Sequence, residues 1–167
     1  MRGGGGFTLI ELILYMALVS IVLAAIIPFA LNIIGGSAKS SAQQEVFSQA
    51  RFVSERIKYE IRNANSINSV NTPVGTIDLN TATNATTVIA LTGGKVTIKY
   101  GAGGTAIILN SNGTIVSNLI FTNYTSLDNK SKHIQFSFTI DDNFGSSRQE
   151  YQVPEVDVEG SSEVRSN

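Results

Sequence analysis

The chain has 167 residues and no cysteine. A disulfide framework is therefore excluded, and so are thiol nucleophiles and thiolate metal sites. The length suits one domain, and the part that follows the apolar amino-terminal segment can bury a modest core. Enzyme classes that depend on thiol chemistry are excluded by this absence alone.

Histidine is almost as scarce, because His133 is the only one. A catalytic base or a metal site at His133 would need distant partners, since no acidic cluster lies near it in the sequence. The oxygen-rich run from Asp141 to Ser146 lacks the full spacing and the terminal glutamate of an EF-hand, so we interpret it as a turn. We predict no catalytic residue, no metal site and no cofactor.

Charge is nearly absent from the start of the chain. Between Phe7 and Ala30 the only ionisable side chains are Glu11 and Tyr15. As a helix this run would be about 36 Å long, which is enough to span a bilayer. A cleaved secretory signal is the alternative, but its apolar region is typically about 7 to 15 residues long and has no acid at its start. We therefore predict an apolar membrane helix over residues 7–34.

Glu11 is the single carboxylate of this apolar run. A carboxylate inside a membrane is costly unless it is paired or neutralised. Alternatively, Glu11 lies one turn below the headgroups and reaches water, in which case it has no role. The nearest candidate for a partner cation is the amine that a cut between Gly6 and Phe7 would release.

The run from Gly6 to Glu11, GFTLIE, resembles the processing motif of type IV pilins and pseudopilins, whose short leader ends in glycine. The resemblance implies that a membrane-embedded prepilin peptidase cuts after Gly6 on the cytoplasmic side and methylates the new amine of Phe7. It also implies that Glu11 meets the Phe7 ammonium of a neighbouring subunit in the core of a fibre. Such a pair sets register more than it adds stability, because both charges are desolvated.

The same resemblance implies several partners: prepilin peptidase, other pilin or pseudopilin subunits, membrane lipid before assembly and, indirectly, an assembly platform protein and its ATPase. The leader Met1–Gly6 departs from the family pattern in having Arg2 as its only positive charge. Arg2 still predicts a cytoplasmic amino terminus, with the rest of the chain outside. The chain also lacks the carboxy-terminal disulfide loop of many major pilins.

Two features are expected to bend or soften the apolar helix. Pro28 removes a backbone donor and clashes with the preceding turn, which predicts a kink. It resembles the helix-breaking proline of pilins, although membrane helices also tolerate proline. Gly35 and Gly36 form a second soft point, where we expect the helix to leave the lipid.

Residues 37–66 are predicted to continue as an amphipathic helix. Apolar residues recur at spacings of three and four, which is typical of a helix that packs on a core: Ala42, Val46, Ala50, Val53, Ile57, Ile61 and Ala64. Arg51 with Glu55, and Arg56 with Glu60, are spaced i, i+4 on the face expected to be exposed. Residues 51–67 resemble the helix end of minor pilins and of the J-type pseudopilins of type II secretion.

After Asn71, β-branched and aromatic residues alternate with polar ones, which predicts strands. We expect them at 76–79, 86–91, 95–100, 105–109, 114–116, 118–123, 133–140 and 149–153. Gly93-Gly94 and Asn112-Gly113 are expected to supply the positive φ angles of tight hairpins. The alternating apolar residues of 133–140 predict a strand that packs on the amphipathic helix. Residues 154–167 are predicted to be a flexible tail.

The predicted fold class is therefore α+β, type IV pilin-like: a long amino-terminal helix, half membrane and half amphipathic, packed against an antiparallel β-sheet head. The head covers residues 35–167, with its sheet at 74–153. Charge is distributed unevenly, since bases outnumber acids in the amphipathic helix while residues 141–163 hold seven acids against Arg148. This asymmetry is either complementarity between subunits or a solvated surface with an acidic tail.

We expect a structural subunit and not an enzyme: a minor pilin or pseudopilin of a type IV pilus, a type II secretion system or a DNA-uptake filament. Its expected place is the cytoplasmic membrane, with the head outside, and then a filament at the cell surface or in the periplasm. A major pilin is the alternative within the family. A membrane-anchored adhesin or ligand-binding protein is the alternative of another class. A surface-anchored hydrolase is disfavoured, because no catalytic constellation is recognisable from spacing.

Overall fold

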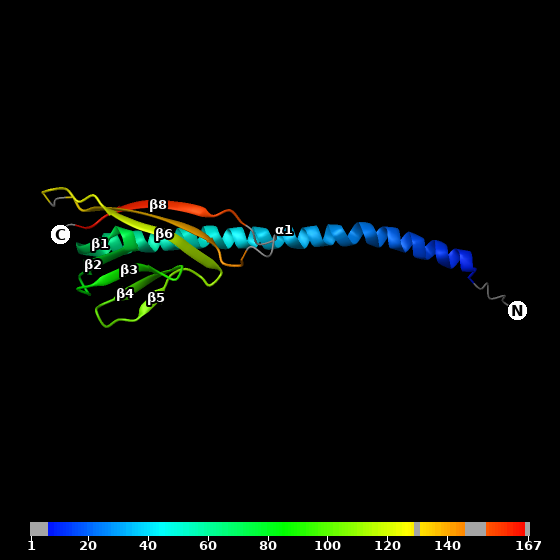
Figure 1. Ribbon diagram of the computed structural model, residues 1–167, viewed down its shortest axis with the longest axis horizontal. Coiled ribbons are helices and arrows are strands. Elements are labelled where there is room, and N and C mark those ends of the chain that lie inside the picture. Colours follow the sequence, from blue (N-terminus) through cyan, green and yellow to red (C-terminus); the bar gives the residue numbers. More distant parts are fainter. Residues whose placement is uncertain (1–6, 129–130, 146–152, 166–167) are drawn as a thin grey trace. The chain divides into compact units, whose positions relative to one another are not determined.

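The computed structural model describes residues 7–128, 131–145 and 153–165. It begins with one long helix, which is followed by a short 3₁₀ turn and eight strands (Figure 1). The elements are α1 (Leu9–Asn63), β1 (Ala64–Asn71), η1 (Thr72–Val74), β2 (Thr76–Thr81), β3 (Thr87–Thr92), β4 (Lys95–Tyr100), β5 (Ala106–Ile108), β6 (Thr114–Asn123), β7 (His133–Asp142) and β8 (Val156–Glu163). The chain divides into two compact units, residues 1–38 and 39–167.

The second unit, the head, contains two antiparallel sheets. Strands β1 to β5 pair in sequence order in one sheet, and β6, β7 and β8 pair in the other. We expected one antiparallel sheet, but the chain leaves the first sheet after β5 and starts the second at β6. Each sheet has an apolar inner face, and the two inner faces share one core with the carboxy-terminal part of α1. The predicted α+β architecture, a long helix with an antiparallel sheet packed on it, is confirmed.

The predicted apolar stripe of the amphipathic helix is confirmed. All seven of its residues are buried, and Val53, Ile57 and Ile61 have no exposed surface. The strand predicted around residues 133–140 packs into the same core, because Ile134 and Phe136 are buried there too. The helix ends at Asn63 and not at residue 66, and Ala64 already belongs to β1.

The predicted i, i+4 ion pairs are partly wrong. Arg56 and Glu60 do pair, with Nη2 and Oε1 2.8 Å apart, but Glu60 is only 4% exposed and does not lie on the solvent face. Glu55 pairs with Lys58 at 3.0 Å and forms no ion pair with Arg51. The register of α1 places Glu60 at the edge of the buried stripe, where a strand residue covers it.

Several strand boundaries differ from the prediction. β1 was not predicted, because its sequence ANSINSVN is polar; it forms by pairing with β2 from Ala64↔Thr81 to Asn71↔Thr76. The two short strands predicted at 114–116 and 118–123 form one strand, β6, which has a register irregularity between Ser117 and Ile120. Most of the strand predicted at 149–153 lies outside the described residues.

The predicted flexible tail is wrong for residues 156–163, which form β8 and pair with β7 from Ile140↔Val156 to His133↔Glu163. Val156 and Val158 pack against the core, and Val164 beyond the strand is buried. The acidic residues alternate with these apolar ones, so they face outward without preventing a strand from forming.

The two glycine turns serve different purposes. Gly93 and Gly94 have φ angles of 57° and 74° and form the tight β3–β4 hairpin, as predicted. Gly113 has no positive φ, and its turn joins two different sheets instead of closing a hairpin. A Cβ atom at Gly113 would lie 2.7 Å from Oε1 of Glu45, so the Glu45 carboxylate would have to move to make room for it.

Candidate functional site

The first unit presents an apolar helical surface. Every residue from Phe7 to Ile34 is exposed, and Phe7 itself is 74% exposed. Among the described residues, α1 is the one helix that is long and apolar enough to cross a membrane. Apolar surface of this extent is costly in water, so lipid or other helices must cover it.

Thr8 and Glu11 form a reciprocal capping box at the start of α1. The Glu11 backbone N–H donates to Thr8 Oγ1 at 3.4 Å, and the Thr8 backbone N–H donates to Glu11 Oε2 at 3.4 Å. The Leu12 N–H closes the first turn by donating to the Thr8 carbonyl oxygen at 3.1 Å. This arrangement satisfies backbone donors that a helix start otherwise leaves unpaired. Thr8 was missed as a site residue, although the spacing Thr-x-x-Glu is itself a capping-box signal.

The carboxylate of Glu11 is thereby fixed at the amino-terminal end of the apolar helix. Its contacts there are two uncharged donors of Thr8, the backbone N–H and the hydroxyl, the latter at 3.5 Å. The aromatic ring of Phe7 packs edge-on against Tyr15, with ring centroids 6.1 Å apart. The structure therefore brings Phe7 and Glu11 within the first turn, while Gly6 lies outside the described residues.

Pro28 lies inside α1, and the helix continues through it and through Gly35 and Gly36. The predicted kink at Pro28 stays a prediction. The hydroxyl of Ser20 donates to the Met16 carbonyl oxygen at 2.7 Å. A buried or lipid-facing hydroxyl is satisfied in this way by its own helix.

The start of the chain matches a known family model, the prokaryotic N-terminal methylation motif, over residues 1–27. This match supports a type IV pilin-like protein, and it covers the amino-terminal segment alone. The motif implies processing by prepilin peptidase and assembly with other pilin subunits. It points to a structural subunit and not to an enzyme. Comparisons with curated proteins and with solved structures found no match.

The head contains a polar cluster that crosses from α1 to β4. The Tyr100 hydroxyl donates to Glu60 Oε1 at 2.5 Å and accepts from Arg56 Nη2 at 2.5 Å. Burial raises the pKa of Tyr100, and its hydrogen bond to the Glu60 carboxylate raises that pKa further. The cluster fastens the first sheet to the helix, and it presents no nucleophile.

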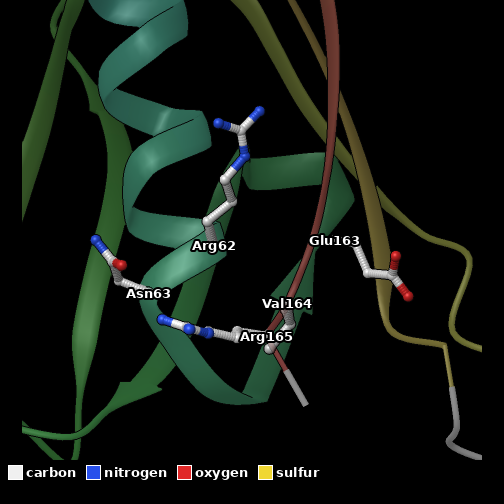
Figure 2. Close-up of a pocket in the computed structure, with 5 residues that line it drawn as sticks. All are labelled: Arg62, Asn63, Glu163, Val164 and Arg165. Atoms are coloured by element: carbon white, nitrogen blue, oxygen red, sulfur yellow. The ribbon is translucent and has the colours of Figure 1, made fainter. Parts of the chain in front are cut away.

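A hollow of about 550 Å³ opens where α1 and β8 end (Figure 2). It is lined by Arg62, Asn63, Glu163, Val164 and Arg165. Figure 2 shows the Glu163 carboxylate turned away from both arginines. This geometry does not assemble an acid–base pair.

The other residues considered for chemistry are not brought together either. Within residues 7–128, 131–145 and 153–165, no group of three or more histidine or acidic residues could hold a metal ion. His133 is the first residue of β7. Asp141 Oδ1 accepts the Asp142 N–H at 2.7 Å, and Asp142 Oδ1 accepts the Phe144 N–H at 2.9 Å. These carboxylates hold a turn.

Proposed function

We propose that the protein is a filament subunit that prepilin peptidase cuts after Gly6 and methylates on the new amine of Phe7. Before assembly the processed subunit resides in the cytoplasmic membrane with its head outside. On assembly its amino-terminal helix enters the packed core of a filament. The filament is a type IV pilus, a type II secretion pseudopilus or a DNA-uptake apparatus, driven indirectly by an assembly platform protein and an ATPase.

One observation carries this proposal: the exposed apolar surface of residues 7–34 contains a single carboxylate, and no cation among the described residues pairs with it. The capping box gives Glu11 hydrogen bonds from two uncharged donors. In lipid or in a helix bundle, an uncompensated carboxylate is strongly unfavourable. The Phe7 ammonium of a neighbouring subunit is the cation that processing would supply at the right level.

A minor pilin or pseudopilin is favoured over a major pilin within this proposal. Two features support it: the likeness of residues 51–67 to the helix end of minor pilins and J-type pseudopilins, and the absence of cysteine. The share of this chain in purified filaments separates the two roles. A minor subunit is present in a few copies per filament, whereas a major pilin makes up most of the mass.

The proposal is tested with Glu11→Leu in cells that assemble the filament. We expect the variant to be processed normally but to enter filaments at least about tenfold less, a loss equivalent to roughly 1.4 kcal/mol or more. Met16→Leu is the control, because it changes another exposed side chain of the same apolar segment without changing its charge. The readout is the ratio of processed subunit in sheared filaments to that in membranes.

A membrane-anchored adhesin gives the opposite result. If the helix is only an anchor, Glu11→Leu leaves export, surface display and head function unchanged, because leucine favours the membrane. Normal incorporation of Glu11→Leu, equal to that of Met16→Leu, would falsify the assembly role of Glu11.

A further inference from the structure

β8 presents an acidic face. Asp157, Glu159 and Glu163 are all exposed and alternate with inward-facing residues of the strand. Among the strands of residues 7–128, 131–145 and 153–165, β8 pairs with β7 alone and is the outer strand of its sheet. At about 3.3 Å per residue these three carboxylates extend over about 20 Å. We call these three residues the acidic face of β8.

The helix in the head presents a basic face. Arg51, Lys58 and Arg62 are spaced by seven and four residues, so they lie on one side of α1, and Glu55 is the acid among them. Arg51 and Arg62 are exposed, and Lys58 is partly so. These three bases extend over about 17 Å. We call them the basic face of α1.

Neither face is neutralised within the subunit. The ion pairs formed among the described residues are Arg56–Glu60 and Lys58–Glu55. Asp157 accepts a hydrogen bond from the Thr139 hydroxyl at 2.7 Å and Glu163 accepts one from the Ser131 hydroxyl at 3.1 Å, but both donors are uncharged. Among the described residues, no ion pair neutralises the acidic face, although exposed Arg165 follows Glu163 by two residues. The basic face retains a net positive charge, because its three bases outnumber Glu55.

The two faces match in length and direction. Consider the two faces placed side by side in parallel, with Arg51 level with Asp157. Measured along the common axis, Lys58 is then offset from Glu159 by about 4 Å, and Arg62 is offset from Glu163 by no more than about 4 Å. Within the head, β8 and the carboxy-terminal part of α1 run the same way (Figure 1). Subunits of a filament share one polarity, so the β8 of one copy and the α1 of the next would also run parallel.

We propose that the acidic face of β8 docks on the basic face of α1 of a second copy of this chain. This inference rests on the proposed function, since it names the contact between heads that follows when their helices assemble. It is a heterologous contact, because different surfaces meet, and such contacts build open helical filaments when the rotation between copies does not close a ring. Each exposed ion pair changes an association constant by only about 1.4- to 5-fold, so the contact fixes the register of the heads while the apolar helices supply the affinity.

The absence of native cysteine allows a direct test. Two differently tagged full-length chains, one carrying Arg51→Cys and the other Asp157→Cys, are produced together in the filament-assembling cell and then oxidised. A disulfide between the two tags can only join separate copies. The control pair replaces Asp157→Cys with Thr92→Cys, an exposed position at the end of β3 in the other sheet.

We expect at least about fivefold more mixed-tag dimer from the Arg51 and Asp157 pair than from the control pair. Adding Glu159→Lys to the Asp157→Cys chain should lower that yield at least about threefold, whereas Glu159→Gln should lower it less, because it removes a charge without reversing it. Glu159 is exposed and forms no ion pair with any residue that the structure describes, so we attribute a loss of dimer to the contact between copies and not to folding.

A yield equal to the control pair, in chains that are processed and incorporated, overturns the contact while leaving the filament role intact. Cross-linking of Asp157→Cys to a different subunit instead of to Arg51→Cys also overturns it. A mixed-tag dimer that forms in membranes of cells where neither chain enters a filament supports the contact and contradicts the filament role. Absence of both the dimer and incorporation contradicts both.

Discussion

Tyr100→Phe removes one oxygen atom from the cluster that joins α1 to the first sheet. The Tyr100 hydroxyl lies between two charged groups, donating to Glu60 and accepting from Arg56. Without it, Glu60 keeps the ion pair with Arg56 at 2.8 Å but loses its second donor. Because Glu60 is only 4% exposed, water does not readily replace that donor.

The cost follows from which group becomes unsatisfied. A hydrogen bond to a charged group contributes about 1.5 to 3 kcal/mol. The Arg56 side chain is 38% exposed and can turn its freed N–H to water, so its loss adds little. We therefore expect the free energy of unfolding to fall by about 2 kcal/mol, which lowers the Tm of a head of this size by roughly 6 to 10 °C.

The assay is thermal unfolding of the full chain in detergent, followed by near-ultraviolet circular dichroism, which reports packing of the aromatic side chains in the head. Tyr59→Phe is the matched control, since Tyr59 is 56% exposed on the same helix and also loses one hydroxyl. The reasoning is refuted if Tyr100→Phe and Tyr59→Phe have the same Tm within about 2 °C, a difference well below 1 kcal/mol.

Three further predictions concern pH, the helix start and the β7–β8 pair. Folding raises the pKa of Tyr100 above its ordinary value of 10.0, so the stability that its neutral form contributes is complete below that pH and is lost as pH rises through the folded pKa. The free energy of unfolding, measured by chemical denaturation, should therefore fall more steeply with alkaline pH in wild type than in Tyr100→Phe. Parallel pH curves for the two proteins would contradict this. Thr8→Val removes the capping box, which costs about 1 kcal/mol. Hydrogen exchange of the Glu11 backbone amide should therefore be about fivefold faster in Thr8→Val than in Thr8→Ser. Equal exchange rates in the two variants would contradict the capping role of Thr8. Gly160→Ala places a Cβ atom 2.4 Å from Cζ of buried Phe136, so it should destabilise the head by about 1 to 3 kcal/mol while exposed Ser161→Ala should not, as measured by urea unfolding; equal stability of the two variants would show that the ring can move aside.

Sequence reasoning succeeded where one periodicity runs long enough. The seven apolar positions of the amphipathic helix and the alternation of 133–140 each identify a buried face without knowledge of its partner. The hairpin at Gly93-Gly94 could be predicted for a similar reason, because tight turns need residues that accept positive φ.

Sequence reasoning failed where a partner element decides the outcome. β1 has no alternation of its own and is a strand because β2 offers it a pairing edge. β8 carried a usable signal, since Val156 and Val158 alternate with acids, but its acidic composition indicated a tail. Glu60 was expected in solvent because the residue that covers it, Tyr100, lies 40 positions further along the chain.

The candidate site at Phe7 and Glu11 was predicted from charge and motif, because its parts lie within a few residues of one another, and their roles stay predictions. The structure adds Thr8 as the residue that orients the Glu11 carboxylate. The acidic and basic faces of the head could not be identified in this way. Their members had to be placed on a strand edge and on one side of a helix before the match in length became visible.

We propose that processing creates a new amine at Phe7 for the Glu11 carboxylate, with which no cation among the described residues pairs. Mass spectrometry of the intact chain, purified from the membranes and filaments of a prepilin peptidase-positive cell, tests it most directly. The predicted result is a chain that starts at Phe7 and carries one additional methyl group on its amino terminus. A chain that retains Met1 in both fractions would contradict the account.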